Sequence, residues 1–373
     1  MATIRWKRAD SYEEANNYIG ANGEVVVDLA ENRLWVYDGA NAYVTAAFTQ
    51  QDGRYIPPYV WAGETKGYLG GGLARGVPQP LSHVPHGTVQ TVSFVSDTNA
   101  TDIAEMASPF LHGQQIVNHD ASAAYWTSGQ IQKTPYASDE CVQVDYSSGA
   151  PTSSYINNVA EPWSSAENGY YNSDGHIHKF PFAITLPGIA APYNWNADAS
   201  LPSGVRAVKL SSTAQSETYG YKMMGYGSPL YRGTVAKFPF SSDTNYEDVG
   251  ELHNDPDART YGAGASVGDK GLAMGGETKA GQKSSFCDAI AFSSDTLSTL
   301  DRTLSGTRYK HCGLSSTSAF YSVGGISSPT GGNADYNHQF DILKSPAASS
   351  VNFSEIGDLA DGHVQSSTLG AND

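Results

Sequence analysis

Short apolar runs that end in glycine recur along the chain from residue 67 onward. The six runs are "GYLGGG" (67–72), "AYWTSG" (124–129), "GYYNSDG" (169–175), "GYKMMG" (220–225), "GLAMGG" (271–276) and "FYSVGG" (320–325). A heptad that is aromatic at its centre and polar at its end follows the runs, as "VSFVSDT" (92–98), "FPFSSDT" (238–244) and "IAFSSDT" (290–296). Apolar runs this short, bounded by turn residues, are typical of β-strands. The pattern therefore predicts a repeated strand-and-turn unit.

Weaker copies of the heptad fill the gaps between the clear ones. "TPYASDE", "FPFAITL" and "FDILKSP" extend the series, so its sixth position falls at Asp97, Asp139, Thr185, Asp243, Asp295 and Ser345. The spacing between these positions is 42 to 58 residues. A period near 50 is typical of kelch-type propeller blades. We predict six blades, with a seventh between 185 and 243 as the alternative, because the spacing is largest there.

The residue types of the repeat favour an architectural role over a catalytic one. Strands rich in Gly, Ala and Ser ("RTYGAGAS", "RYKHCGLSS" and "HVQSSTLGA") suit the crowded centre of a propeller, where backbones approach closely. Glycine pairs predict turns with positive φ, aromatic residues of "KFPF" should fill the wedge between blades, and "SSDT" should bond its local backbone. The repeat region begins with the second strand type of a blade and ends with the first strand type. This order predicts that residues 363–371 pair with the blade begun at 59–72, which closes the ring without an unpaired edge strand.

Composition supports an all-β chain and excludes two classes of partner. The 373 residues include 39 Gly and 23 Tyr, and the formal net charge is −16. An acidic chain without clustered Lys and Arg argues against a nucleic-acid partner. No apolar run approaches the length of a membrane span, and Cys141, Cys287 and Cys312 show no metal or disulfide spacing. We expect reduced cysteines in a chain assembled in a cytoplasm.

Residues 1–50 lack the repeat and form a separate predicted module, whereas 55–373 form the propeller. "GEVVVDLAENRLWVYDG" (23–39) predicts two strands, Glu24 to Leu29 and Arg33 to Tyr37. A two-stranded ribbon is marginal alone, so its apolar residues need a partner surface. That surface belongs to the propeller, to another protein or to further copies of the ribbon.

The first forty residues resemble the N-terminal modules of bacteriophage tail and fibre proteins. The resemblance rests on Arg5 and Arg8, on Gly23-Glu24 with Asp28, and on "RLWVYDG" (33–39). The chain departs from that pattern at Tyr37, where glycine is commoner, and at Ala9-Asp10. The resemblance implies a β-prism that trimerises and anchors the protein to the virion through Val25, Val27, Leu34, Trp35 and Val36. The repeats are similar to kelch-like arrays in structural proteins of cyanobacterial and marine phages.

No catalytic, metal or cofactor motif stands out, and we expect a protein that is not an enzyme. "HIH" (176–178) has no partner motif for a metal. Tyr- and Trp-rich segments are typical of adaptable binding loops. Candidate receptor contacts are Tyr155, Trp163, Tyr170, Tyr171, Tyr193 and Trp195.

We therefore predict a virion protein, a tail fibre, spike or baseplate appendage that binds a host glycan or protein receptor. A capsid decoration or tail scaffold that binds other virion proteins is the first alternative, and a glycan-cleaving propeller enzyme is the second.

Overall fold

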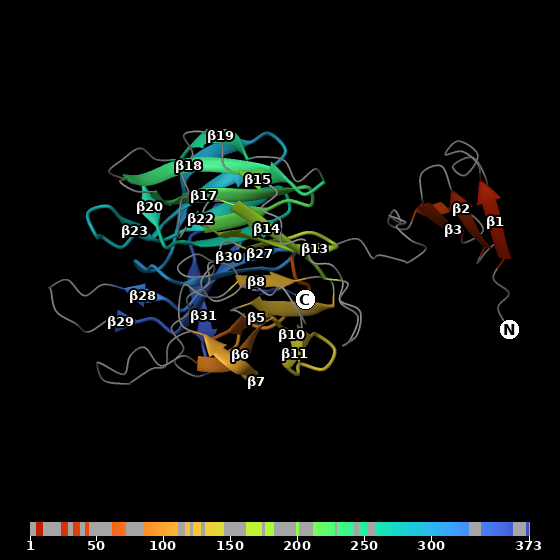
Figure 1. Ribbon diagram of the computed structural model, residues 1–373, viewed down its shortest axis with the longest axis horizontal. Coiled ribbons are helices and arrows are strands. Elements are labelled where there is room, and N and C mark those ends of the chain that lie inside the picture. The colour runs from red at the N-terminus through yellow and green to blue at the C-terminus, as the bar shows by residue number, and fades with distance from the viewer. Residues whose placement is uncertain are drawn as a thin grey trace. The chain divides into compact units, whose positions relative to one another are not determined.

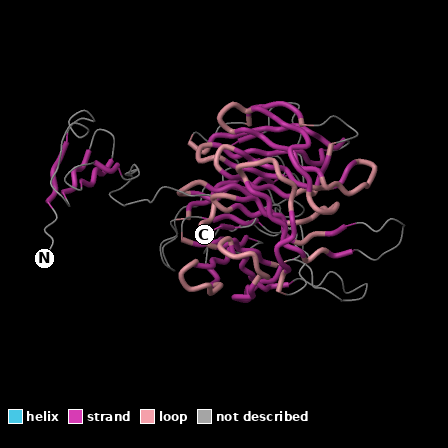
Figure 2. The backbone as a smooth tube through the Cα atoms, turned by 180° about the vertical axis from the view of Figure 1, so that it is seen from behind, coloured by secondary structure: helices cyan, strands magenta, loops and turns pink. Residues whose placement is uncertain are grey.

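The chain is all-β throughout the part that the structure describes (Figure 2). This computed structural model describes residues 5–9, 24–28, 33–37, 42–44, 62–71, 86–110, 116–119, 122–127, 131–144, 162–173, 176–182, 199–200, 212–227, 230–241, 246–252, 258–327, 337–360 and 371–372. The chain divides into two compact units, Met1–Val60 and Trp61–Asp373. Among these residues no helix has the length and apolar character needed to cross a membrane.

The first unit contains one four-stranded sheet in the order β1-β2-β3-β4 (Figure 1). Its strands are β1 (Arg5–Ala9), β2 (Glu24–Asp28), β3 (Arg33–Tyr37) and β4 (Ala42–Val44). The predicted ribbon is confirmed as the antiparallel pair β2–β3, and β1 adds to it in parallel. Val25 pairs with Val36, Val27 with Leu34 and Val26 with Trp35. The side chains of these residues lie outside the described part of the chain, so their role in oligomerisation stays a prediction.

The described residues of the second unit form six four-stranded antiparallel sheets, numbered here in chain order. The first three sheets are β32-β5-β6-β7 (Ala371–Asn372, Lys66–Gly70, His86–Ser93, Thr101–Phe110), β8-β9-β10-β11 (Ile116–His119, Ala123–Thr127, Ile131–Pro135, Val142–Val144) and β12-β13-β14-β15 (Pro162–Ser164, Asn168–Ser173, His176–Pro181, Ala199–Ser200). The last three are β16-β17-β18-β19 (Ser212–Gln215, Tyr219–Gly227, Leu230–Pro239, Glu247–Glu251), β21-β22-β24-β25 (Ala263–Val267, Lys270–Met274, Phe286–Ala291, Thr296–Thr303) and β26-β27-β30-β31 (Cys312–Ser315, Ala319–Val323, Asp341–Pro346, Ser354–Asp358). Two small pairs, β20-β23 (Arg259–Thr260, Glu277–Thr278) and β28-β29 (Ile326–Ser327, Asn337–His338), lie in the connections of the last two sheets.

The first-named strands of the six sheets contact one another in a closed order, and we call them the cycle strands. The contacts run β32–β8–β12–β16–β21–β26 and return to β32. The closing member, β32, pairs with β5 through Ala371 and Tyr68. The predicted pairing of residues 363–371 with the first sheet is thus observed at Ala371, whereas residues 363–370 lie outside the described part of the chain.

One residue of each cycle strand takes part in a series of hydrogen bonds between backbone and side chain. His119 N donates to Ser164 Oγ (3.0 Å), Ser164 N to Gln215 Oε1 (2.8 Å), Gln215 N to Ser266 Oγ (2.8 Å), Ser266 N to Ser315 Oγ (2.8 Å), and Ser315 N to Asn372 Oδ1 (3.0 Å). All six residues are buried. Since each bond joins a different sheet to the next, the series ties all six sheets together.

Glycine permits the closest approach between neighbouring cycle strands, as predicted from the small-residue segments. A Cβ on Gly264 would lie 1.7 Å from the Thr213 carbonyl oxygen of the preceding sheet. A Cβ on Gly313 would lie 1.7 Å from the Gly264 oxygen. Both contacts are to backbone, so no side-chain rotation could relieve them.

The heptad aromatics pack between sheets, as predicted. The ring at the third heptad position lies against a tyrosine of the preceding sheet in five pairs: Phe94–Tyr321, Tyr136–Tyr68, Phe182–Tyr125, Phe240–Tyr170 and Phe292–Tyr221. Their ring centroids are 4.7 to 5.0 Å apart. These aromatic contacts bury large apolar area at the five boundaries that carry them.

The heptad aspartates also bind the preceding sheet, which corrects the prediction that they serve their own turn. Asp295 accepts from the Tyr221 hydroxyl (3.1 Å) and the Lys237 ammonium (2.5 Å). Asp139 accepts from Tyr68 (2.9 Å) and Lys66 (2.8 Å) in the same way. Burial, with the Asp295 carboxylate adjacent, raises the pKa of Tyr221. We call this arrangement the Tyr–Lys–Asp clasp.

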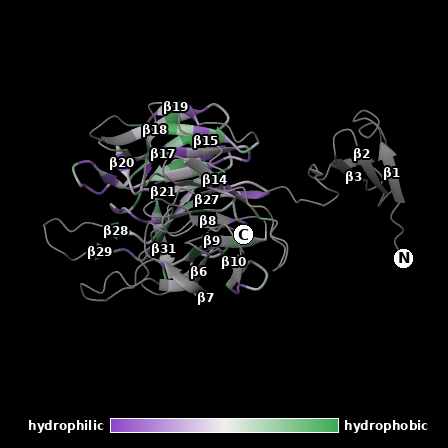
Figure 3. Cartoon of the chain, in the orientation of Figure 1, coloured by the Kyte–Doolittle hydropathy of each residue, from purple (hydrophilic) through white to green (hydrophobic). Residues whose placement is uncertain are grey.

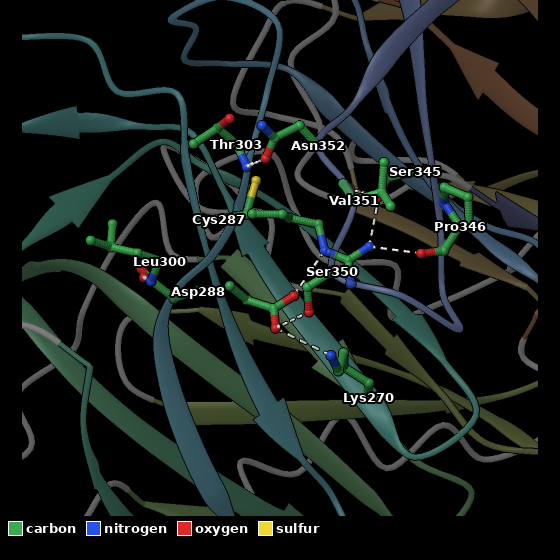
Figure 4. Close-up of polar contacts among 12 residues, drawn as sticks. Lys270, Cys287, Asp288, Leu300, Thr303, Ser345, Pro346, Ser350, Val351 and Asn352 are labelled. Atoms are coloured by element: carbon green, nitrogen blue, oxygen red, sulfur yellow. Dashed lines mark hydrogen bonds and ion pairs between the residues drawn. The ribbon is translucent and has the colours of Figure 1, made fainter.

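The sixth heptad position of the last repeat is Ser350, and its assignment to Ser345 was wrong. The strand register pairs Lys344 with Tyr321, as Lys237 pairs with Tyr221. Counting from these lysines, Ser350 occupies the place of Asp243. Ser350 donates to Asp301 of the fifth sheet (3.0 Å), which Lys270 also binds (Figure 4).

The cysteines agree with the sequence-based expectation in part. Cys287 and Cys312 are buried, Cys141 is half-buried, and none is in a disulfide. Burial raises the pKa of the Cys287 thiol to about 12.

Candidate functional site

The two ends of the six sheets differ in their connections. Within each sheet consecutive strands are antiparallel, so the turn between strands one and two lies at the same end as the turn between strands three and four. We call this the short-turn end. Strand β5 begins at the same end, since Lys66 pairs with Ser93 beside the β6–β7 turn.

At the opposite end, the connections of the fifth and sixth sheets carry the strand pairs β20–β23 and β28–β29, and we call this the long-connection end. Figure 3 shows a largely hydrophilic segment around β20 and β23. Loops on a rigid scaffold are common places for binding residues.

Two buried arginines support this end at the fifth and sixth sheets. Arg259 pairs with Asp288 and donates to the Phe286 carbonyl (2.7 Å). Arg308 pairs with Asp341 (2.7 Å) at the matching place in the sixth sheet. Buried guanidinium–carboxylate pairs of this kind fix geometry through several directed bonds.

The residue two positions after each arginine has a left-handed backbone. Tyr261 has φ 57° and Lys310 has φ 53°, and Lys310 N donates to the Tyr261 carbonyl (2.8 Å). A non-glycine residue in this region costs on the order of 1–3 kcal/mol and persists only where surrounding contacts impose it. The predicted positive φ of the glycine pairs is confirmed next to them, at Gly275-Gly276 and Gly324-Gly325.

Side chains from the fifth and sixth sheets and their connections meet in a cluster of aromatic rings and charges, which we call the Tyr261–Lys310 cluster. The Lys310 ammonium lies 5.2 Å from the Tyr261 ring centroid and 5.5 Å from that of Tyr309. Lys283 lies 4.0 Å from the Tyr309 centroid and pairs with Glu277 (2.5 Å). Tyr309 is buried, whereas the other four residues are half-buried and reachable from solvent. The cluster can therefore offer a ring face, an ammonium and a carboxylate to a ligand.

His311, directly beneath the cluster, is held neutral. Its Nε2 donates to the Met274 carbonyl (3.0 Å), so Nδ1 accepts from the Ser322 hydroxyl (2.8 Å). Burial, with the charge of Arg308 nearby, lowers the pKa of His311 to about 3. His311 is therefore a structural residue at neutral pH and not a proton donor.

His311 should make the second unit sensitive to acid. Its ordinary pKa is 6.5 and its folded pKa is about 3, so between these values unfolding takes up a proton and stability falls as pH falls. We expect His311→Gln to remove about 2 kcal/mol of the stability loss between pH 7.5 and pH 5. Urea denaturation of both proteins at the two pH values measures this difference, and an equal pH dependence would contradict it.

Two of the six predicted receptor contacts belong to the core, which corrects that part of the prediction. Trp163 lies in β12 and Tyr170 in β13, both fully buried with Phe238 and Phe240. The Trp163 indole donates to the Tyr221 carbonyl (2.9 Å). Because both rings fill the boundary between the third and fourth sheets, a receptor cannot reach them.

The remaining candidates stay predictions. Tyr171 lies in β13, but its side chain is outside the described residues. Tyr155, Tyr193 and Trp195 also lie outside them, as do the side chains of His176 and His178. Within the described ranges, no three His, Cys, Asp or Glu residues come close enough to hold a metal ion.

The cluster gathers residues that no sequence argument had selected. The sequence does contain one indication of the cluster, the arginine repeated in "RTYGAGAS" and "RYKHCGLSS". Aligning these two segments on that arginine matches Tyr261 with Lys310. Comparison with known proteins gives no further guide, since no protein family matches the sequence and no curated protein is significantly similar to it.

Proposed function

We propose that residues 61–373 form a six-bladed, kelch-like β-propeller closed by β32. The observation that carries this proposal is the closed order of contacts among the cycle strands, together with the series of five hydrogen bonds that runs from the second sheet through to β32. A propeller of four-stranded blades has its first strands around a common axis and needs its last and first segments to share a sheet. The pairing of Ala371 with Tyr68 meets that need.

Asn372→Ala tests the closure. Asn372 is buried, and its loss leaves Ser315 N without an acceptor, so we expect a loss of about 1–3 kcal/mol in the free energy of unfolding. Asn352→Ala is the matched control, because exposed Asn352 also accepts one backbone bond of 3.0 Å, from Thr303 N. Guanidinium denaturation of both variants gives the values. Equal, small losses would count against a closed ring.

We further propose that this chain is a non-enzymatic phage virion protein that binds the host cell surface. The resemblance of residues 1–40 to phage attachment modules supports the virion part. The sheet β1–β4 places strands on the segments that carry that resemblance. Its trimerisation through β2 and β3 belongs to the same proposal.

The two ends of the sheets support the host-binding part. Strand β5 begins at the short-turn end of the second unit, whereas the Tyr261–Lys310 cluster lies at the other end. Binding residues often lie on loops that a rigid scaffold positions, and the cluster lies in the connections of such a scaffold.

Two measurements on the full chain test this function. Antibody against the chain should label phage particles in electron micrographs, and purified protein should bind cell envelopes from a panel of bacteria. Labelling of the capsid without envelope binding would favour a decoration protein, and release of reducing ends from envelope glycans would favour an enzyme.

A further inference from the structure

We propose that the Tyr261–Lys310 cluster binds a carboxylated sugar of an acidic glycan. This inference rests on the proposed host-binding function and names the ligand class for one site of it. The first observation concerns charge. The protein has a net charge of −16, yet the ammonium groups of Lys283 and Lys310 both lie over the Tyr309 ring. Lys279 precedes Lys283 on the same short segment of the sequence.

Lys310 is the residue best placed to bind an anion. Lys283 already pairs with Glu277, while Lys310 forms no ion pair with any residue that the structure describes. Its ammonium lies over two tyrosine rings, whose faces attract a cation but leave its hydrogen-bond donors available. Burial lowers the pKa of Lys310, so an incoming carboxylate would stabilise its charged form.

The neighbouring groups match the rest of a sugar acid. The half-buried Tyr261 ring offers an apolar surface for a pyranose face, and Glu277 offers acceptor oxygens for its hydroxyls. A rigid ring, one cation and a few polar groups are the usual composition of a small-ligand site.

The backbone holds these groups ready before any ligand arrives. Tyr261 and Lys310 are joined by a hydrogen bond, and each follows an arginine anchored to a buried or partly buried aspartate. Because Tyr261 and Lys310 both have positive φ, glycine would fit the backbone at either position with less strain. Binding therefore should require little reorganisation of the fifth and sixth sheets.

Calorimetry of the full chain with tetragalacturonate tests the proposal. We expect binding that weakens as salt is raised and that is lost with the methyl-esterified tetramer, which keeps the rings and removes the charges. Lys310→Gly should weaken binding at least tenfold while thermal stability is kept or raised, since glycine relieves the positive φ. Tyr261→Asn, which tolerates the left-handed backbone, should weaken it as well.

Lys133→Met is the matched control. Lys133 lies 5.2 Å from the Tyr125 ring centroid, so this variant removes the same charge and the same kind of contact from another sheet. It should bind tetragalacturonate as the wild type does. The proposed site would be overturned if the methyl ester or inorganic phosphate bound as tightly as tetragalacturonate, or if Lys310→Gly bound tetragalacturonate as tightly as the wild type. Absence of tetragalacturonate binding by the wild type would overturn it too.

Envelope binding separates this site from the proposed function. If Lys310→Gly no longer binds tetragalacturonate but still binds envelopes as strongly as the wild type, the host receptor binds at another site. The acidic glycan is then not the host ligand. If the wild type binds tetragalacturonate and no bacterial envelope, the site stands and host binding fails.

Discussion

Replacing Gly264 by alanine should destabilise the second unit by at least about 3 kcal/mol, the upper part of the range for overpacked cores. The new methyl carbon would lie 1.7 Å from the Thr213 oxygen, 2.6 Å from its carbonyl carbon and 2.7 Å from its nitrogen. All three atoms are backbone, so β16 and β21 would have to separate. That separation would also stretch the bond from Gln215 N to Ser266 Oγ.

Two further glycines give this prediction its controls. Gly306→Ala adds the same methyl group where nothing lies within 4 Å, and we expect a change within about 0.5 kcal/mol. Gly313→Ala should match Gly264→Ala, since its methyl carbon would meet the Gly264 oxygen at 1.7 Å. Thermal and chemical denaturation provide the comparison. A Gly264→Ala protein as stable as Gly306→Ala would show that the cycle strands do not approach this closely.

The sheets were predictable because the repeated residues contact one another. The heptad aromatic and aspartate recur since each meets a tyrosine of the preceding sheet, and a contact repeated in space leaves a repeat in sequence. The lysine that completes the clasp lies in "KFPF" for Asp295 and in "KSPA" for Asp97, and "KTPY" has Lys133 at the same position. Aligning on that lysine gives Ser350 in the last repeat, where Ala347 replaces the aromatic ring and so hid the register.

The candidate site was not predictable in the same way. Tyr261 and Lys310 belong to different sheets, and their hydrogen bond depends on two left-handed residues that sequence does not reveal. Aromatic composition led in the wrong direction, because Trp163 and Tyr170 fill a boundary between sheets. Tyrosine is both a binding residue and a packing residue, and strand register decides which.

Replacing Arg259 by methionine should cost about 3–5 kcal/mol, because it leaves the Asp288 carboxylate buried without its cation. The Asp288 side chain is 0% exposed and accepts a bond from Leu300 N (2.9 Å) in addition to its pairing with Arg259. The double variant Arg259→Met with Asp288→Asn removes the bare charge and keeps an acceptor for Leu300 N, so it should be more stable than Arg259→Met alone. Urea denaturation compares the two. Since Arg259 also fixes the backbone leading to Tyr261, Arg259→Met should weaken tetragalacturonate binding in either background. Equal stability of the single and double variants would mean that packing of the arginine stem, and not the charge of Asp288, sets the cost.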